Sequence, residues 1–137
     1  MSSFKIFDIA GSGMNAQNLR LNLVASNMAN VDAVSSSIDQ TYRARQPVFE
    51  AMLDQANRRN PAVGVRMAGV VESEAPLVRE YAPDHALADD EGYIYRPNVN
   101  VIEEMANMIS ASRAYQSNVE VVNATRRMMA ATINLGK

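Results

Sequence analysis

The sequence contains no cysteine, and only one of its 137 residues is histidine. Without cysteine the chain can form no disulfide, no thiolate metal site and no cysteine-based catalytic centre. Its charges nearly cancel, because 13 basic and 15 acidic side chains leave a net charge of −2. This balance gives no sign of the basic patch that nucleic-acid binding usually needs. We therefore expect no nucleic-acid partner.

Long apolar runs are also missing, since none approaches the ~18 residues that a membrane-spanning helix requires. The N-terminal segment MSSFKIFDIAGSGM has no basic stretch followed by an unbroken apolar core, as a cleaved secretory signal would. We expect a chain that does not span a membrane. It either stays in the cytosol or leaves the cell by a route that needs no cleaved signal.

Residues 4–31 carry the seven-residue apolar repeat of a helix that packs against another helix. One series comprises Phe7, Met14, Leu21 and Met28, and a second comprises Ala10, Gln17, Val24 and Val31. Gly11 and Gly13 weaken the first turns by up to ~1 kcal/mol each relative to alanine. We expect the start of this helix to fray or bend.

Residues 98–135 repeat the pattern over a longer stretch. One series comprises Val101, Met108, Tyr115, Val122 and Met129, and the other comprises Met105, Ser112, Val119, Arg126 and Ile133. Asn100 followed by Glu103 predicts an N-cap with a reciprocal acidic partner. At ~1.5 Å per residue this helix would be a rod roughly 50 Å long.

The middle of the chain changes character, because proline and glycine divide residues 33–96 into short runs. Residues 33–46 resemble a linker that enters an extended segment. Apolar and polar residues alternate in 63–67 and around 77 and 93–95, which predicts short β-strands joined by a turn-rich connection at 83–92. The predicted fold class is mainly α with a small β subdomain. Its helical core domain is formed by residues 1–32 and 97–137 as a coiled coil, with the β-rich insertion at 33–96.

Charge is scarce along both predicted helices. Between Ile9 and Val31 the one charged residue is Arg20, and between Met105 and Thr125 the charged residues are Arg113 and Glu120. A pair of helices in water normally fills its outer positions with charge. Amides and hydroxyls tolerate burial when they find partners, whereas isolated charges do not. This pattern favours helices surrounded by other subunits over a mildly polar exposed surface.

The candidates for enzymatic chemistry are weak. His85 lies near Asp84, Asp89, Asp90 and Glu91, but a lone histidine among acids in a turn has no metal-ligand spacing. The GSG sequence at 11–13 lacks the third glycine and the preceding strand of a nucleotide-binding loop. We expect no enzyme, no cofactor and no small-molecule substrate.

Both ends of the chain carry motifs of one known family. The N-terminal stretch with ASNMAN at 25–30, and the C-terminal stretch with EEMANMI and SRAYQSN, resemble the flagellar axial proteins, which include rod and hook subunits. The two motifs occur in the family's order and together cover about half the chain. The short length and the phrases GYIYRPNVNVIEEM and APDHALADDEG are similar to those of a proximal rod subunit. The second phrase departs from the family pattern at Ala82 and Ala86.

The resemblance implies a structural subunit of the bacterial flagellar basal-body rod, which crosses the periplasm and transmits torque. It implies export by the flagellar type III apparatus. The terminal helices would pack in the rod's inner layer, with the β-rich middle outside. Partners would be copies of the chain and other proximal and distal rod proteins, with the export gate and the MS-ring base nearby.

The residues expected to make helix and subunit contacts are Phe7, Met14, Leu21, Val24, Asn27, Met28, Asn30, Val101, Met105, Met108, Tyr115, Val119, Val122 and Met129. Asn27 and Asn30 are expected either to bond a neighbouring subunit or to cap the helix end. Two alternatives stay open. One is a soluble coiled-coil adaptor or export-associated chaperone, and the other, more distant, is an enzyme that uses His85.

Overall fold

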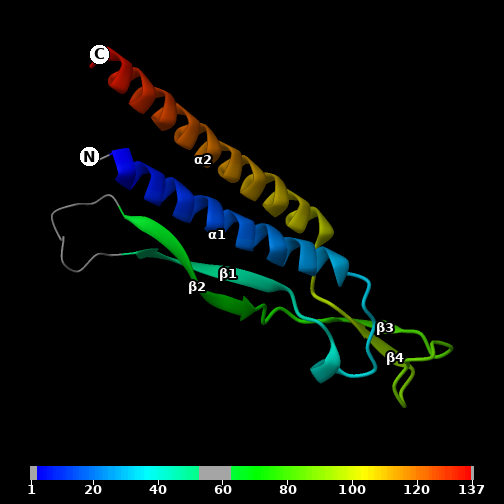
Figure 1. Cartoon of the computed structure of the whole chain (residues 1–137). Helices are drawn as coiled ribbons and strands as arrows, with labels where there is room; N and C mark the ends of the chain where they lie inside the picture. Colours follow the sequence, from blue (N-terminus) through cyan, green and yellow to red (C-terminus); the bar gives the residue numbers. More distant parts are fainter. Residues whose placement is uncertain (1–2, 53–62, 137) are drawn as a thin grey trace.

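The computed structural model describes residues 3–52 and 63–136. Two long helices, α1 (Ser3–Ala29) and α2 (Val101–Leu135), run side by side, and α1 lies between α2 and a β-hairpin (Figure 1). The other elements are β1 (Arg45–Met52), β2 (Gly64–Glu72), β3 (Val78–Tyr81), β4 (Tyr93–Arg96) and the short 3-10 helix η1 (Ile38–Gln40). The predicted order of helix, strands and helix is confirmed.

The two helices begin and end close to where the sequence predicts. The Asn100 side chain accepts hydrogen bonds from the backbone N–H groups of Ile102 and Glu103, so the predicted N-cap of α2 is confirmed. Within the described residues, no bond joins the Glu103 carboxylate back to the Asn100 N–H, so the reciprocal half of the cap is not formed. α1 is continuous through Gly11 and Gly13, and the fraying expected there is not observed. No helix in the described ranges is long and apolar enough to cross a membrane.

The β-rich middle forms two separate two-stranded sheets. β1 pairs antiparallel with β2, with a bulge between Val48 and Phe49, and this hairpin lies along α1. The Ser12 hydroxyl of α1 links the two elements, because it accepts a hydrogen bond from the Val65 N–H of β2 at 3.1 Å. α1 therefore has two neighbours in the fold, α2 and the β1–β2 hairpin.

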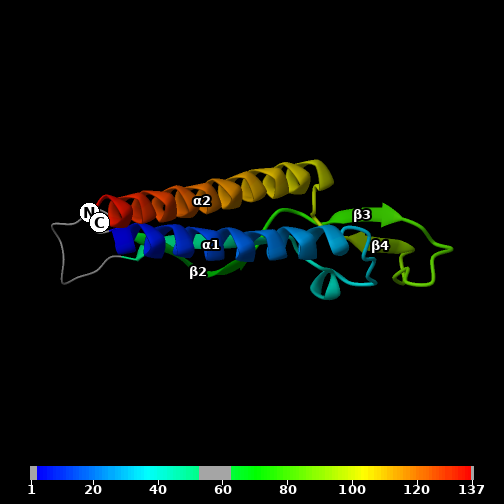
Figure 2. The same cartoon turned by 45° about the horizontal axis from the view of Figure 1, so that its top comes forward.

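The second hairpin, β3 with β4, lies past the helix ends, at the end of the molecule opposite both termini (Figure 2). The Ser35 N–H and C=O exchange hydrogen bonds with Tyr95 of β4, which ties the segment after α1 to this hairpin. The sequence predicted β2, β3, β4 and the connection between the last two. It gave β1 only as an extended segment, because Pro47 interrupts the strand pattern.

Small side chains make up most of the buried apolar core. Its members are Ala10, Ala16, Val24, Ala44, Ile94 and Ala111. Small residues allow two helices to approach closely, but they remove little apolar area from water. Consequently, most of the large apolar side chains lie at the margins of the helix pair or outside it.

Candidate subunit-packing surface

The contact between α1 and α2 is lined by small and polar groups. Gly13 lies so close to Asn118 that a Cβ atom on this glycine would be 2.9 Å from the Asn118 Nδ2. Two turns further along α1, the Arg20 guanidinium donates to the Asn107 Oδ1 at 3.0 Å. These contacts fix how the two helices are aligned along their length, but they bury little apolar surface. The hydrophobic effect alone therefore contributes little to the stability of the helix pair.

Asn27 joins three parts of the fold. Its Nδ2 donates to the Arg45 carbonyl at 2.9 Å and to the Glu104 Oε2 at 3.0 Å, and its Oδ1 accepts from the Arg45 N–H and the Tyr42 hydroxyl. The side chain is 1% exposed. A primary amide offers two donors and two acceptor sites, so Asn27 is fully satisfied within one chain. It neither caps the helix nor has a group to offer another subunit.

Asn30 takes one of the two roles that the sequence left open. Its Nδ2 donates to the Ser26 carbonyl at 2.8 Å, one of the last carbonyls of α1. The Asn30 backbone N–H donates to the same carbonyl at 3.2 Å, so the side chain adds a second donor there. Asn30 therefore reinforces the last turn of α1 at its C-terminal end.

The face that α2 turns toward α1 differs from the predicted one. Met108, Val122 and Met129 of the first predicted series are half-buried, but Tyr115 and Val101 are 37% and 40% exposed. The second inward series is Glu104, Ala111, Asn118 and Thr125, of which Glu104, Ala111 and Thr125 are buried. Each member of this series comes one residue before a member of the predicted series, which is Met105, Ser112, Val119, Arg126 and Ile133. One residue corresponds to a rotation of about 100° around the helix axis.

That rotation leaves a broad apolar surface uncovered on α2. The exposed large apolar side chains of this helix are Val101, Ile102, Met105, Ile109, Tyr115, Val121, Met128, Ile133 and Leu135. We call two adjacent heptad series the outer stripe; they are Met105, Ser112, Val119, Arg126, Ile133, and Ile102, Ile109, Gln116, Asn123, Ala130. Contiguous exposed apolar patches commonly mark protein contact sites.

The outer face of α1 is uncharged rather than apolar. Asn15, Asn18 and Asn22 are all exposed, and the one charged residue exposed along this helix is Asp8. The predicted contact residues of α1 are more consistently buried than those of α2. Phe7, Met14, Leu21 and Met28 are half-buried, and Val24 is buried. The outer face of α1 is thus nearly uncharged, as the scarcity of charge indicated, whereas α2 exposes Glu103, Arg113, Glu120, Arg126 and Arg127.

Ile102 and Ile109 fall outside both predicted series and are exposed on the outer stripe. Their seven-residue spacing, with Met105 between them, could have revealed a third apolar series. Glu104 is likewise absent from the predicted contact residues, yet it is buried, although glutamate is rarely buried without a partner. The spacing of Glu104 to Ala111 and Thr125 carries no apolar signal that would have indicated this burial.

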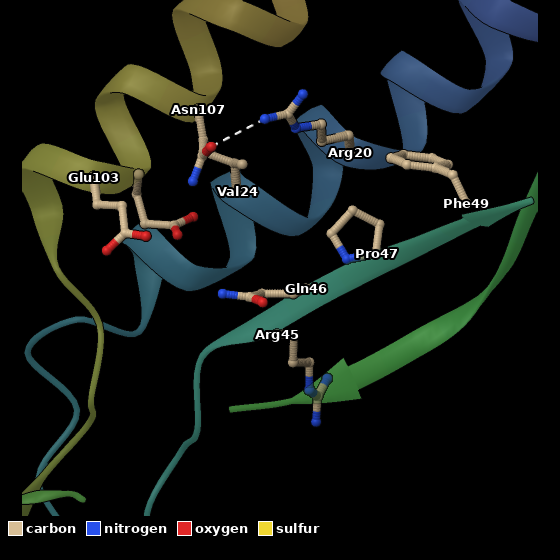
Figure 3. A pocket seen from close by; sticks show the side chains of 9 residues that line it. Arg20, Val24, Arg45, Gln46, Pro47, Phe49, Glu103 and Asn107 are labelled. Atoms are coloured by element: carbon tan, nitrogen blue, oxygen red, sulfur yellow. Dashed lines mark hydrogen bonds between the residues drawn. The ribbon is translucent and has the colours of Figure 1, made fainter. Parts of the chain in front are cut away.

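A cavity of about 370 Å³ opens between α1, β1 and the start of α2 (Figure 3). Its lining is Arg20, Val24, Arg45, Gln46, Pro47, Phe49, Glu103, Glu104 and Asn107. Arg20 points toward Asn107 and bonds it, whereas the Glu103 carboxylate lies at the opposite side of the opening. We refer to this cavity as the α1–β1–α2 groove.

The β3–β4 hairpin is held by polar contacts around Asp89. The Tyr93 N–H, at 2.8 Å from the Asp89 Oδ1, lowers the pKa of this carboxyl group, and donation by the Glu91 N–H and the Tyr95 hydroxyl adds to the effect. The Arg79 guanidinium lies 3.6 Å from the centre of the Tyr93 ring and donates to Glu91. These contacts order a turn and assemble no reactive centre.

His85 also serves the turn. Its Nδ1 accepts a hydrogen bond from the Leu87 N–H at 3.1 Å, and the side chain is exposed. Across residues 3–52 and 63–136, no group of three or more His, Asp or Glu side chains could hold a metal ion. The geometry around His85 is that of a local turn contact.

Comparison with known proteins gives one consistent result. Residues 7–35 match the family model for the flagella basal body rod protein, and residues 90–135 match the model for the C-terminal part of the flagellar basal body rod FlgEFG proteins. The two matches cover α1 and α2, the segments that carry the motifs quoted above.

Full-length relatives agree with these matches. The flagellar basal-body rod protein FlgC of Salmonella typhimurium is 47% identical over 137 residues, and that of Escherichia coli O6:H1 is 49% identical over 139 residues, each with 100% of both chains covered. The protein of the same name from Borreliella burgdorferi is 33% identical over 142 residues, with 93% of each chain covered.

Proposed function

The chain belongs to the flagellar basal-body rod protein family, and on that premise we propose how its surfaces build a rod. Like the relatives named FlgC, it is a structural component of the basal-body rod and not an enzyme. The enzyme that the sequence left open, with His85 as its reactive group, is not supported. A soluble adaptor or an export-associated chaperone is likewise not favoured by these relatives.

We propose that neighbouring subunits cover the outer stripe of α2 and the amide-rich face of α1. The observation that carries this proposal is the exposure of four large apolar side chains on the outer stripe, namely Ile102 at 80%, Ile133 at 65%, Ile109 at 54% and Met105 at 50%. Burying such side chains stabilises an assembly by roughly 25 cal/mol per Å² of apolar surface. A head-to-tail contact that does not close into a ring extends into a helical assembly, which is the outcome that a rod requires.

The contact residues expected from the sequence take different places in this proposal. Val101, Met105, Tyr115 and Val119 would face other subunits in coiled-coil-like packing. Phe7, Met14, Leu21, Val24, Met28, Met108, Val122 and Met129 would hold the helix pair of one subunit together. Asn27 and Asn30 fix the end of α1 and the start of β1.

We further propose that the chain belongs to the proximal part of the rod and helps to transmit torque across the periplasm. Its neighbours would be copies of itself and other proximal and distal rod proteins, near the export gate and the MS-ring base. Export by the flagellar type III apparatus would bring the chain to its place in the rod, as the resemblance to flagellar axial proteins implies. Torque would pass through many helix contacts at once, so no single site would carry it.

The Ile109→Asp variant tests the proposed packing surface. Ile109 is 54% exposed, so the folded subunit should keep its melting temperature within about 3 °C of the original. Its charge would be buried between subunits, and we expect no rods and no swimming in a strain that relies on this chain. Circular dichroism of the purified subunit, and electron microscopy of isolated basal bodies, measure the two effects.

Ser110→Asp is the matched control, because Ser110 is the next residue, is exposed and lies about 100° further round α2, outside the outer stripe. This variant should assemble and swim normally. Normal rods from Ile109→Asp would overturn the proposed surface. Loss of rods from Ser110→Asp as well would show that any added negative charge on α2 is harmful.

A further inference from the structure

Arg126 is the one charged residue on the outer stripe of α2. Apolar and neutral residues surround it on this stripe, and it makes no ion pair within the described part of the chain. If neighbouring subunits cover the stripe, the guanidinium loses water. An arginine buried without an acidic partner is strongly destabilising. The proposed packing therefore requires a carboxylate opposite Arg126.

Glu104 is an acidic side chain that lacks a cationic partner in the described part of the chain. This residue is 7% exposed, and the one hydrogen bond that its carboxylate accepts from the described residues comes from the neutral Asn27 amide. No cation in the described ranges pairs with Glu104 or with the neighbouring Glu103. A buried carboxylate is stabilised far better by a cation than by a single amide.

The two arginines that line the α1–β1–α2 groove are engaged elsewhere. Arg20 bonds Asn107, and Arg45 bonds Glu72 and lies over the Tyr42 ring. The groove thus has an acidic side, formed by Glu103 and Glu104, that lacks a counter-charge. Its volume of about 370 Å³ greatly exceeds the ~30 Å³ share of one water molecule, so it has room for a side chain.

The same chain cannot join these two groups. Arg126 follows Glu104 by 22 residues on one straight helix, a separation of about 33 Å. A second copy displaced along the helix direction can bring its Arg126 to the groove. Its exposed Ile133, seven residues further along the same stripe, is then available for apolar contact.

We propose that Arg126 of one subunit inserts into the α1–β1–α2 groove of a second copy and pairs there with Glu104 and Glu103. Val24, Pro47 and Phe49 line the apolar side of that groove and pack against the stem of the arginine side chain and the residues beside it. The pair fixes the axial offset between copies, which an apolar stripe with a seven-residue repeat leaves ambiguous. This inference rests on the proposed function, because it requires the stripe to be covered by a neighbouring subunit.

Charge reversal at Arg126 tests the pair. Arg126→Glu places like charges in the groove, and we expect at least about tenfold fewer assembled basal bodies, counted by electron microscopy. Arg127→Glu is the matched control, because this exposed neighbour points to the polar side of α2 and should leave the count unchanged. Equal counts for the two variants would overturn the pair.

Rescue separates a pairing role from a structural one. Glu103 is exposed, so Glu103→Arg should leave the subunit folded while it lowers basal-body numbers by a similar factor. Combining Glu103→Arg with Arg126→Glu restores opposite charges and should recover most of the lost assembly. A double variant that assembles no better than either single variant counts against the inference.

Cross-linking tests the contact directly, because the natural chain has no cysteine. Subunits that carry both Glu103→Cys and Arg126→Cys should give covalent dimers when isolated rods are treated with a short bismaleimide reagent, because an Arg–Glu pair holds the two Cα atoms further apart than a disulfide can bridge. Glu103→Cys combined with Glu120→Cys should not, because Glu120 lies on the polar side of α2. Absence of the first cross-link from intact rods overturns the groove contact and leaves the packing surface standing. That surface fails separately if Ile109→Asp assembles.

Discussion

At the scale of single residues, Asn27 is the side chain that links the most parts of this fold by hydrogen bonds. It donates to β1 and α2 and accepts from β1 and Tyr42, so one carboxamide fixes three parts of the chain. Alanines make up four of the six buried apolar residues of the described chain, and they contribute little apolar area. The hydrogen bonds of Asn27 therefore add to modest apolar packing in holding the end of α1.

Asn27→Ala should unfold the subunit more easily. The change leaves the Arg45 backbone and the Glu104 carboxylate without partners, which costs at least about 2 kcal/mol. We expect a drop in Tm of roughly 6–12 °C in thermal melts followed by circular dichroism. Asn22→Ala, on the exposed face of α1, should leave the Tm unchanged or slightly higher. Similar Tm values for the two variants would contradict the role assigned to Asn27.

Asp89 gives the β3–β4 hairpin a dependence on pH. The Tyr93 N–H, assisted by Glu91 and Tyr95, lowers the pKa of the carboxyl group in the folded chain. A lowered pKa means that the folded chain stabilises the ionised carboxylate more than the unfolded chain does. Its contribution is present above the unfolded pKa of about 3.9 and is lost as the pH falls through the lower, folded value.

We predict that the connection between β3 and β4 loosens in acid. The protection factors of the Glu91 and Tyr93 amides, which compare their exchange in NMR spectra with that of an unfolded chain at the same pH, should fall below about pH 4, because protonated Asp89 accepts hydrogen bonds poorly. In Asp89→Asn both protection factors should be low already at neutral pH and should change little in acid. Asp90→Asn is the control, and protection in the Asp89 variant that still falls sharply in acid would assign the effect to another group.

At the scale of elements, the approach of α1 to α2 depends on Gly13. A Cβ atom there would meet Asn118, whereas nothing lies within 4 Å of a Cβ atom at Gly11. The sequence treats both glycines alike, as weak points of a helix. The structure separates them, because one faces the partner helix closely and the other does not.

The two glycines should therefore respond differently to alanine. Gly11→Ala should raise the free energy of unfolding by up to ~1 kcal/mol through better helix propensity. Gly13→Ala should gain nothing or lose stability, because Asn118 would have to move from its hydrogen bond to the Ala114 carbonyl. Urea unfolding of both variants gives the comparison. An equal gain at both positions would mean that the helices can separate at no cost.

At the scale of the whole molecule, the subunit is elongated, with both termini at one end and the β3–β4 hairpin at the other (Figure 2). α2 contacts α1 along one face and leaves its apolar stripes uncovered. The final turns are the least covered, since Met128, Ile133 and Leu135 are all exposed. Segments with few buried contacts open most readily.

We expect the end of α2 to be the most dynamic helical segment of the single subunit and to become ordered in the rod. Hydrogen exchange should be fast for residues 126–135 in the dilute chain and slow in isolated rods, whereas residues 104–111 should be protected in both. Mass spectrometry of peptides from the two samples measures this difference. Uniform protection of α2 in the dilute chain would contradict it.

Local pattern in the sequence determined the elements. Apolar repeats of seven residues predicted two long helices, the side chain of Asn100 fixed where α2 begins, and alternation with turn residues predicted β2, β3 and β4. The motifs at both ends indicated the family. These features depend on neighbours a few residues away, which the sequence displays directly. The scarcity of charge likewise indicated surfaces that are not simply exposed to water.

Only the tertiary structure decided which face of each helix is used. The apolar residues of α2 span several adjacent series, and a single partner helix can cover just one part of them. The choice depends on close approach at Gly13 and on the hydrogen bonds of Asn27 and Glu104, which join residues 77 positions apart. Such contacts leave no periodic pattern in the sequence, because they join residues far apart along the chain. The hydrogen bonds of one buried polar side chain then outweigh several apolar side chains that no partner helix covers.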